Sequence, residues 1–233
     1  MMRALAIAVS CSSLLGVEVL GQEAPVDQSS LTTEVFQLAL RNIQLRGLYR
    51  KGRWSYGLHV GYRPSFGDRT TITEANGFFS GYTQWLHGNG VFQGATAGPI
   101  LRYHVGRDRR GWLELELMYR HWWYTKRHVE FDGWRTQYEG QRSEQVQVYA
   151  WKMLWGGTIA TNLHFGPRAR VIFEGFGGIG ARNKFARWTM HEGMLNGEHV
   201  KDRNGITASW VPSFHMGIRL GLDRAVRLRD GLQ

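Results

Sequence analysis

The chain is poor in the residues that cross-link or stiffen a polypeptide. It has one cysteine, Cys11, and five prolines in 233 residues, so an internal disulfide framework is excluded. After the first 21 residues there is no apolar run of eighteen or more, and the sequence therefore predicts no transmembrane helix. Apolar residues at helical spacing are not sustained there either, which argues against a helical fold.

The first 21 residues are predicted to be an export signal. A basic start at Met1–Arg3 precedes two apolar stretches, and Val19–Gly21 fits a small-residue cleavage site before Gln22. The polar, Pro25-containing segment that follows argues against the alternative, a buried helix. Cys11 leaves with the signal unless it is a lipoprotein cysteine, which the short apolar stretch before it disfavours. The remaining chain must be stabilised by ordinary burial or by lipid.

Glycine and aromatic residues are abundant, with 30 glycines, 10 tryptophans, 9 tyrosines and 11 phenylalanines. Membrane barrels have such a composition because aromatic girdles lie at both interfaces of the bilayer. The formal net charge of +10 usually indicates nucleic acid or acidic surfaces as partners. An exported chain does not meet a genome. We therefore expect no nucleic acid but anionic lipid or lipopolysaccharide as the counter-charge, or basic side chains that line an interior.

Alternation of apolar and polar residues is the dominant pattern. From Trp210 to Leu222, apolar residues occupy one parity and small, polar or basic residues the other, so a strand here has one apolar face. The segment is long enough to cross a bilayer as a tilted strand, which needs about 9–11 residues. Similar alternation is found in 54–63, 99–104, 113–120, 148–155 and 170–174, and shorter apolar stripes lie in 36–40 and 43–49.

Short and long connections between these segments alternate. The short, turn-rich connections are 50–53, 106–111 and 161–167, and the long, polar ones are 64–90, 124–144 and 183–206. Outer-membrane barrels have short periplasmic turns and longer extracellular loops. The sequence thus predicts an all-β fold, an eight-stranded antiparallel up-and-down transmembrane β-barrel of the outer-membrane type, with extracellular loops and both termini in the periplasm.

The expected organisation is a signal peptide (1–21), a periplasmic N-terminal segment (22–31), the outer-membrane barrel (32–222) and a periplasmic C-terminal tail (223–233). The first strand is predicted over 32–40, followed by a tight outer turn at Arg41–Asn42. Two alternatives concern the strand count: one long strand over 34–49, or an extra strand within 76–92.

Segments 42–63, 173–182 and 212–222 resemble small outer-membrane β-barrels common in Bacteroidota. This family has no known function, and OmpA- and OmpX-like barrels are its distant architectural relatives. The resemblance implies an outer-membrane location, assembly by the barrel-assembly machinery and no established catalytic residues. Many such barrels end on an aromatic residue in the last strand. Here Asp223–Gln233 follows without one, so the assembly signal is absent or lies further inward, at Phe214–Met216.

If the apolar parity faces lipid, the other parity fills the interior, because eight strands enclose only enough space for side chains. Unpaired charges in such a space are costly, so acidic and basic residues are expected to pair. The predicted interior charge network comprises Arg46, Arg63, Arg102, Glu114, Glu116, Arg120, Lys152, Arg170, Glu174, His215 and Arg219, and His59 and His104 share its parity. We expect it to block conduction; the alternative is a narrow, anion-preferring path.

A second group of residues is predicted to contact lipid headgroups or a surface partner. It comprises Trp122, Trp123, Tyr124, Lys126, Arg127 and His128. Aromatic rings prefer the membrane interface, and cations just beyond the interface can meet lipid phosphates. Phe78, Phe79, Tyr82 and Trp85, in the first long connection, are further candidates for a contact surface. No protein partner can be named from these residues.

Catalysis, metal binding and cofactors are not expected. Outer-membrane lipid-modifying enzymes use serine, histidine and a carboxylate, but no recognised spacing joins the candidates His59, His104, His121, His215, Ser55, Ser209 and Ser213. His191–Glu192 and Glu198–His199 do not form an H-E-x-x-H motif. We expect a structural or surface-interaction role. The alternatives are a lipid-modifying enzyme and a soluble, lipocalin-like barrel that binds a small apolar ligand and has its apolar parity inside.

Overall fold

A computed structural model describes residues 27–39, 42–65, 69–73, 92–132, 137–165 and 169–225. The predicted signal peptide (1–21) lies outside these residues. So do the tail from residue 226 onward and the candidate extra strand over 76–92, apart from Phe92. Among the candidate surface residues, Phe78, Phe79, Tyr82 and Trp85 also lie outside the described part of the chain.

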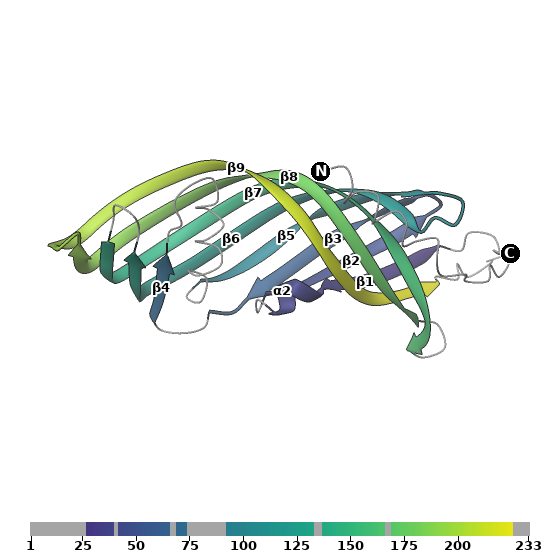
Figure 1. The fold of residues 1–233 in the computed structure, drawn as a ribbon, viewed down its shortest axis with the longest axis horizontal. Coiled ribbons are helices and arrows are strands. Elements are labelled where there is room, and N and C mark those ends of the chain that lie inside the picture. Colours follow the sequence, from purple (N-terminus) through teal and green to yellow (C-terminus); the bar gives the residue numbers. More distant parts are fainter. Residues whose placement is uncertain are drawn as a thin grey trace, which may run out of the picture.

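The described residues are almost entirely strand, with one short helix (Figure 1). In chain order the elements are β1 (Gln28–Glu34), α2 (Val35–Ala39), β2 (Ile43–Lys51), β3 (Trp54–Arg63), β4 (Arg69–Thr73), β5 (Gln93–Val105), β6 (Gly111–Asp132), β7 (Gln137–Phe165), β8 (Ala169–Leu195) and β9 (Glu198–Ala225). In the described part of the chain, no helix is long and apolar enough to cross a membrane.

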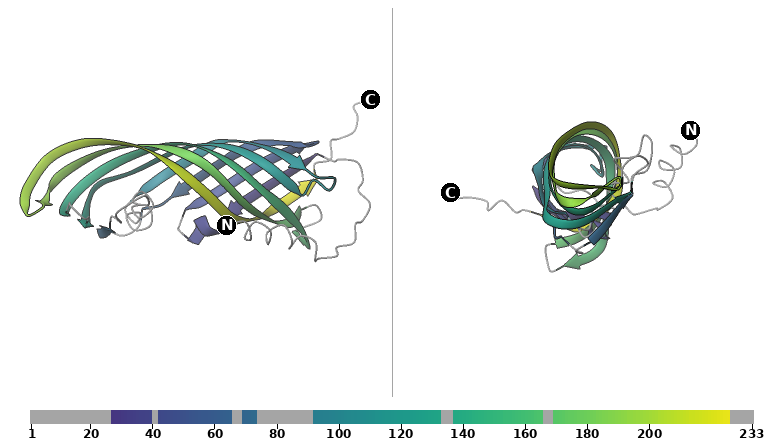
Figure 2. Two further views of the ribbon diagram at one scale, coloured as in Figure 1. Left: turned by 45° about the horizontal axis from the view of Figure 1, so that its top comes forward. Right: turned by 90° about the vertical axis from the view of Figure 1, so that its left-hand side faces the viewer.

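Eight of the described strands form a closed ring in the order β6-β5-β3-β2-β1-β9-β8-β7, and β7 pairs with β6 to complete it. Every neighbouring pair in this ring is antiparallel. The right-hand view of Figure 2 looks along the ring and shows the strands wrapped around one axis. β4 lies outside the ring and pairs in parallel with the far end of β6. The predicted all-β class with eight antiparallel strands is confirmed.

The first hairpin differs from the prediction. The strand expected over 32–40 is wrong, because β1 begins at Gln28 and Val35–Ala39 form α2. The Asn42 backbone N–H donates to the carbonyl oxygen of Gln37 (2.9 Å), and its side-chain amide donates to Gln37 Oε1 (2.8 Å). These bonds stabilise a helical turn where an apolar stripe of five residues fits either a strand or a helix. One continuous strand over 34–49 is wrong for the same reason.

The strands of the ring also span more of the sequence than predicted, from Gln28 to Ala225 rather than from 32 to 222. Asp223 therefore belongs to β9, not to a tail beyond the last strand.

Two of the long connections are largely strand rather than loop. β6 and β7 continue to Asp132 and Gln137, and β8 and β9 meet at a turn between Leu195 and Glu198. The predicted loops 124–144 and 183–206 are therefore wrong over most of their length. Their outer faces are polar, but the inner faces of β6, β7 and β8 bury Val129, Tyr138 and Met190, and a strand packed on one face is stable in water. Residues 198–206 of β9 are mostly exposed on both faces and are held by pairing with β8. We call the described parts of 125–143 and 187–206 the extension; these strands project beyond the others in Figure 1.

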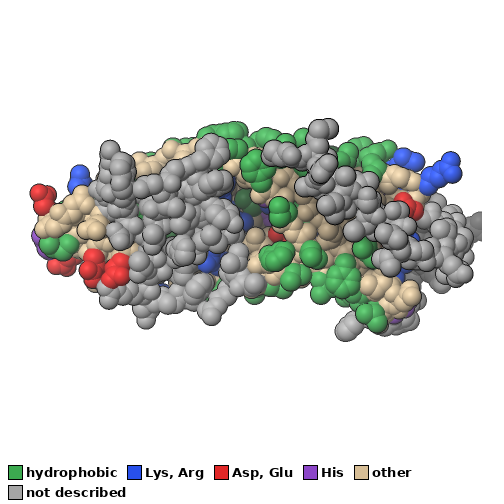
Figure 3. Space-filling model, in the orientation of Figure 1, with side chains coloured by type: hydrophobic (Ala, Val, Ile, Leu, Met, Phe, Trp, Pro, Cys, Tyr) green, Lys and Arg blue, Asp and Glu red, His purple; other side chains and the backbone are tan. Residues whose placement is uncertain are grey.

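Strand parity separates two chemically opposite faces in the ring. The inward residues include Arg46, Glu116 and Arg219, none more than 1% exposed. The outward face carries large apolar residues that are exposed. We call them the apolar belt: Trp54, Tyr56, Leu58, Val60, Tyr62, Leu113, Leu115, Leu117, Tyr119, Tyr149, Trp151, Met153, Trp155, Phe173, Ile179, Phe185, Trp210, Phe214, Met216, Ile218 and Leu220. Apolar side chains form several patches on the outer surface of the ring in Figure 3.

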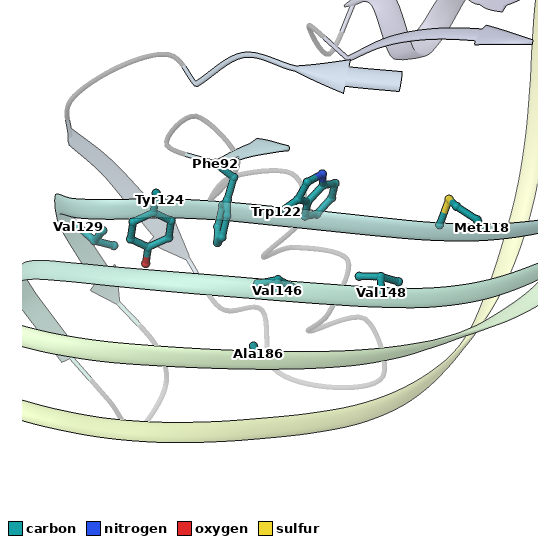
Figure 4. Packing of buried hydrophobic residues seen from close by; sticks show 8 residues of the cluster. All are labelled: Phe92, Met118, Trp122, Tyr124, Val129, Val146, Val148 and Ala186. Carbon is teal, nitrogen blue, oxygen red and sulfur yellow. The ribbon is translucent and has the colours of Figure 1, made fainter. Parts of the chain in front are cut away.

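A small apolar core lies inside the ring at the end nearest the extension (Figure 4). Phe92 packs edge-on against Tyr124, with ring centroids 4.6 Å apart. Val129, beyond a bulge in β6, is fully buried against the same cluster. The core members are Phe92, Met118, Trp122, Tyr124, Val129, Val146, Val148 and Ala186. This core joins the ring to the extension.

Only the C-terminal part of β9 has a partner strand on both sides among the described strands. Its last residues, Arg219–Ala225, pair with β1, whereas the residues before Arg219 pair with β8 alone among the described strands. Side chains here lack a neighbour on one side, so Phe214 and Met216 are 80% and 84% exposed. Within the described residues, backbone hydrogen bonds close the ring completely only at the end where β1 pairs with Arg219–Ala225. Toward the extension, one edge of β9 has no partner strand among those described.

Candidate functional site

A dense cluster of charged side chains occupies the ring near its fully paired end. The side chains project from different strands, because each lies at an inward position: Arg46 from β2, Arg102 from β5, Glu114 and Glu116 from β6, Lys152 from β7, Glu174 from β8 and Arg219 from β9. Glu34, at the end of β1, adds a further carboxylate. We call these eight residues the charge network.

The contacts of the charge network form a continuous chain. Arg46 pairs with both Glu114 and Glu116. Lys152 Nζ lies 2.5 Å from Glu116 Oε1. Arg219 Nη2 lies 3.3 Å from Glu114 Oε1, and its Nε lies 3.5 Å from Glu34 Oε1. Glu114 is thus shared between several cations, which makes the network a single cluster.

The charge network is formally neutral, because four carboxylates face four cations. A buried ion pair costs solvation energy of both groups, and hydrogen bonds must offset that cost. Aromatic rings add contacts: the guanidinium carbon of Arg102 lies 4.1 Å from the centre of the Trp112 ring, and that of Arg219 lies 4.1 Å from the Phe176 ring. Such stacking is attractive to a desolvated cation. Side chains therefore fill this end of the ring.

The structure divides the predicted interior residues into three groups: members of the charge network, two residues with separate partners (Arg170 and His215), and cations nearer the extension. Arg46, Arg102, Glu114, Glu116, Lys152, Glu174 and Arg219 belong to the charge network. Arg170 does not, since it pairs with Asp223 at 3.6 Å near the end of the ring and its side chain is 43% exposed. His215 bonds with Ser213, with 2.9 Å between Nε2 and Oγ.

Arg63 and Arg120 form the third group, on the side of the extension, together with Arg182 and Lys184. We call these four residues the cationic tier. Sequence reasoning missed Lys184 because it lay within an expected loop, and it did not assign Arg182 to the interior. Both have the inward parity of Glu174, and counting in twos along β8 would have found them.

The predicted surface group is divided by the strand on which it lies. Trp122 and Tyr124 are 8% and 3% exposed and pack in the interior core, so they are not surface contacts. They share the inward parity of Glu114, a signal present in the sequence. Trp123 points outward beside His121, with ring centroids 5.2 Å apart. Lys126 is exposed at a bulge, and Arg127 and His128 are partly exposed.

Two serine–histidine pairs lie inside the ring, and a third, Ser143 Oγ with His191 Nε2 at 2.9 Å, lies in the extension. Ser55 Oγ is 2.8 Å from His104 Nε2, and the other ring nitrogen of His104 lies 3.2 Å from the carbonyl oxygen of Arg109. A catalytic triad has a carboxylate in that position. Ser55 and His104 are also 2% and 6% exposed. Among the described residues, neither this pair nor Ser213–His215 has a carboxylate hydrogen-bonded to the histidine, so no triad is assembled there.

The extension holds one group with metal-binding donors. His128, Glu130 and Glu139 offer ligand atoms that all lie within 4.8 Å of one another, and His128 Nε2 is 3.5 Å from Glu139 Oε1. Both glutamates also take part in other interactions. The candidates His191–Glu192 and Glu198–His199 contribute one exposed pair, Glu192 with His199 at 3.8 Å.

A shallow apolar groove of about 500 Å³ crosses the outer face of the ring. Small residues such as Ala97 and Ala181 form its floor, and Tyr119, Trp151 and Trp210 border it.

No family model, curated protein or solved structure matches the chain.

Proposed function

We propose that the chain is an outer-membrane β-barrel protein whose eight strands cross the bilayer, with the extension outside the cell and both termini in the periplasm. Its role is structural or concerned with surface interaction, and its counterparts are membrane lipid and lipopolysaccharide. The observation that carries the proposal is the apolar belt surrounding a charged interior. A water-soluble protein rarely exposes a large contiguous apolar surface, whereas lipid requires one.

The dimensions of the apolar belt support the proposal. On β3 it runs from Trp54 to Tyr62, with aromatic residues at both limits. These nine residues match the roughly 9–11 that a tilted strand needs to cross a bilayer. Tyr56 and Trp155 near one edge, with Tyr119 and Tyr149 near the other, fit the two aromatic girdles of such proteins. The groove beside Trp151 suits a lipid acyl chain.

The charged interior disfavours the soluble, lipocalin-like alternative. A barrel that holds an apolar ligand needs apolar side chains inside, whereas Arg46, Glu114 and Arg219 are among the most buried residues here. A lipid-modifying activity is also not proposed, because the buried Ser55–His104 pair lacks a carboxylate. Replacing His215 or His59 and analysing lipid A in vivo tests this negative prediction; altered lipid would contradict it.

The membrane proposal is tested by placing a charge on the apolar belt. Leu115 and Leu58 lie in the middle of the belt, on β6 and β3. In vesicles of bacterial phospholipid, Leu115→Arg and Leu58→Arg are expected to lower the free energy of unfolding by about 2–4 kcal/mol each. The same change at Thr125, exposed in the extension, is the matched control and should cost less than about 0.5 kcal/mol.

Refolded wild-type protein is expected to need detergent and to migrate differently on gels before and after boiling. A wild-type protein that stays monomeric in buffer without detergent would contradict the proposal. So would a Leu115→Arg variant as stable as Thr125→Arg.

A further inference from the structure

The charged interior changes character along the ring axis. The charge network is formally neutral, but the cationic tier beside it consists of Arg63, Arg120, Arg182 and Lys184. We infer that the cationic tier is a binding site for a phosphate group, supplied by a lipid headgroup or by a free phosphate. This goes beyond the proposed function, and binding of free phosphate does not depend on membrane insertion.

Strand register brings the cationic tier together. Arg120 on β6 pairs with Val148 on β7, and Val148 pairs with Lys184 on β8. Arg182 lies two residues from Lys184 on the same face of β8. The short Val148 side chain between them leaves their charged groups facing the same part of the interior. Arg63 and Arg120 are 5% and 8% exposed, so two of the four cations are held within the protein.

Acidic partners are missing for three of these cations. Across the described residues, no carboxylate lies within 4.0 Å of the charged nitrogens of Arg120, Arg182 or Lys184. Arg120 experiences repulsion from Arg182 and Arg63, and Glu34 and Glu116 attract it from beyond ion-pair distance. The neighbouring carboxylates are engaged: Glu116 binds Lys152 and Arg46, and Glu144 lies 3.1 Å from Arg142. Like charges gathered in a confined space are costly unless an anion joins them.

The donors suit phosphate. Arg120 Nε donates to Thr96 Oγ1 at 3.1 Å, and its guanidinium carbon lies 4.7 Å from the centre of the Trp122 ring. The guanidinium is thus oriented, and in the described structure its two terminal nitrogens donate to no protein acceptor. A planar guanidinium fork matches two phosphate oxygens, and the Lys184 ammonium adds a point charge. Several cations converging on one site favour a doubly charged anion.

Access is available along β9. Lys184 pairs with Ser209 and Arg182 with Val211, and the edge of β9 beyond these small residues has no partner strand among those described. Lys and Arg side chains are visible in a hollow near the centre of the face shown in Figure 3. Tyr119 and Phe185, at the upper limit of the apolar belt, flank Arg120 and Lys184 in sequence. A lipid phosphate at the membrane interface would lie at this depth.

The test compares the double variant Arg182→Gln/Lys184→Gln with Arg187→Gln, which removes an exposed outward cation from the same strand. Each protein is refolded in a neutral detergent. Calorimetry measures the binding of inorganic phosphate, and native mass spectrometry measures the binding of phosphatidic acid against diacylglycerol. Wild-type protein and Arg187→Gln should bind alike. The double variant should bind about tenfold more weakly or worse, the loss of at least one charge-assisted hydrogen bond.

Stability without ligand provides a second readout. Removing repelling charges should leave the melting temperature of the ligand-free double variant unchanged or raised, whereas a purely structural pair would lower it. Should the double variant fail to fold, Arg182→Gln and Lys184→Gln are measured singly, and each should weaken binding. Binding of phosphatidic acid without inorganic phosphate identifies a lipid source; binding of both identifies a general phosphate site. Absence of both in the wild type, or equal binding in the variants, overturns the inference.

Discussion

Arg102 on β5 and Glu174 on β8 meet inside the ring, although β6 and β7 lie between their strands. Arg102 Nη2 donates to Glu174 Oε2 at 2.9 Å, while Arg102 Nε donates to Glu114 Oε2, also at 2.9 Å. Thr158 Oγ1 adds a bond to Glu174 at 3.3 Å. The Arg102–Glu174 contact connects strands that have no backbone hydrogen bonds to one another, whereas the other two contacts join neighbouring strands. The charge network therefore braces the ring from within.

Removing one charge from this brace should be costly. Glu174→Gln keeps the shape of the side chain but leaves Arg102 and Arg219 without part of their compensation. We expect the free energy of unfolding to fall by about 3–5 kcal/mol in denaturant titrations of the refolded protein. Asp108→Asn breaks an exposed pair with Arg110, 3.5 Å long, and should cost less than about 1 kcal/mol. Equal losses in the two variants would contradict the bracing role.

The charge network and Trp112 should block ion flow. Trp112 is 1% exposed and stacks on Arg102. Wild-type protein in a planar lipid bilayer is therefore expected to show no stepwise conductance. Arg102→Ala/Trp112→Ala removes two of the largest interior side chains and should produce conductance steps. Steady anion-selective conductance in the wild type would instead support the narrow anion path, the alternative drawn from the excess of interior bases.

Two adjacent glycines within β7, Gly156 and Gly157, should respond differently to replacement by alanine. A Cβ at Gly156 would lie 2.3 Å from the carbonyl oxygen of Gly175 and 2.6 Å from the Trp112 ring, so Trp112 and the β8 backbone would have to move. Gly156→Ala should lower stability by about 1–3 kcal/mol. A Cβ at Gly157 would meet nothing closer than 3.9 Å, and Gly157→Ala should be neutral or stabilising by less than about 1 kcal/mol. Thermal melts of the two variants provide the comparison, and the reverse order would exclude this packing.

The bulge in β6 contains an unusual backbone conformation. Lys126 has a φ of 42°, in the left-handed region, at the register shift between Tyr124 and Arg127. Lys126→Gly should be neutral or slightly stabilising, whereas the β-branched Lys126→Val should cost about 1–3 kcal/mol locally. Hydrogen exchange across the extension measures this local stability, and Thr125→Val, without a positive φ, is the control. Unchanged exchange in Lys126→Val would contradict the strained bulge.

Much of the ring could be predicted from period two. Residues 54–62 and 113–119 keep strict alternation because each face of the strand meets a uniform environment. Glu114 and Glu116, which alternation predicted to point inward, are buried in the structure. The turn at Gly52–Arg53 follows from glycine, which has a φ of 63° there. Patterns of this kind are local, so they can be recognised without knowing which strand lies alongside.

Predictions failed where the environment changes along a strand. Polar outer residues in 124–144 indicated a loop, but Val129 and Tyr138 pack on the inner face, and the strand pairing continues past the bulge. Three consecutive aromatic residues at 122–124 suggested one belt, although alternation separates Trp122 and Tyr124 from Trp123. The five-residue α2 was also missed, because its stability depends on Asn42, which lies outside the helix.

The partners of the interior charged side chains could not be predicted from the sequence either. Parity identified candidates for the interior, but it could not tell which of them meet. Whether Glu34 reaches Arg219, or Arg120 faces Lys184 instead of a carboxylate, depends on the stagger of strands far apart in sequence. The division between the charge network and the cationic tier is therefore a property of the assembled ring alone.

The short β1 has a consequence for the order of folding. Its seven residues hold the seam between β2 and β9, and Leu31 pairs there with Leu222. The other junctions join strands that are closer in the chain, and the hairpins of β6–β9 form from local turns. Contacts between distant residues cost more entropy to close and form more slowly. We accordingly expect the β1–β9 seam to be the last junction to form as the chain folds, and the first to separate under force or denaturant.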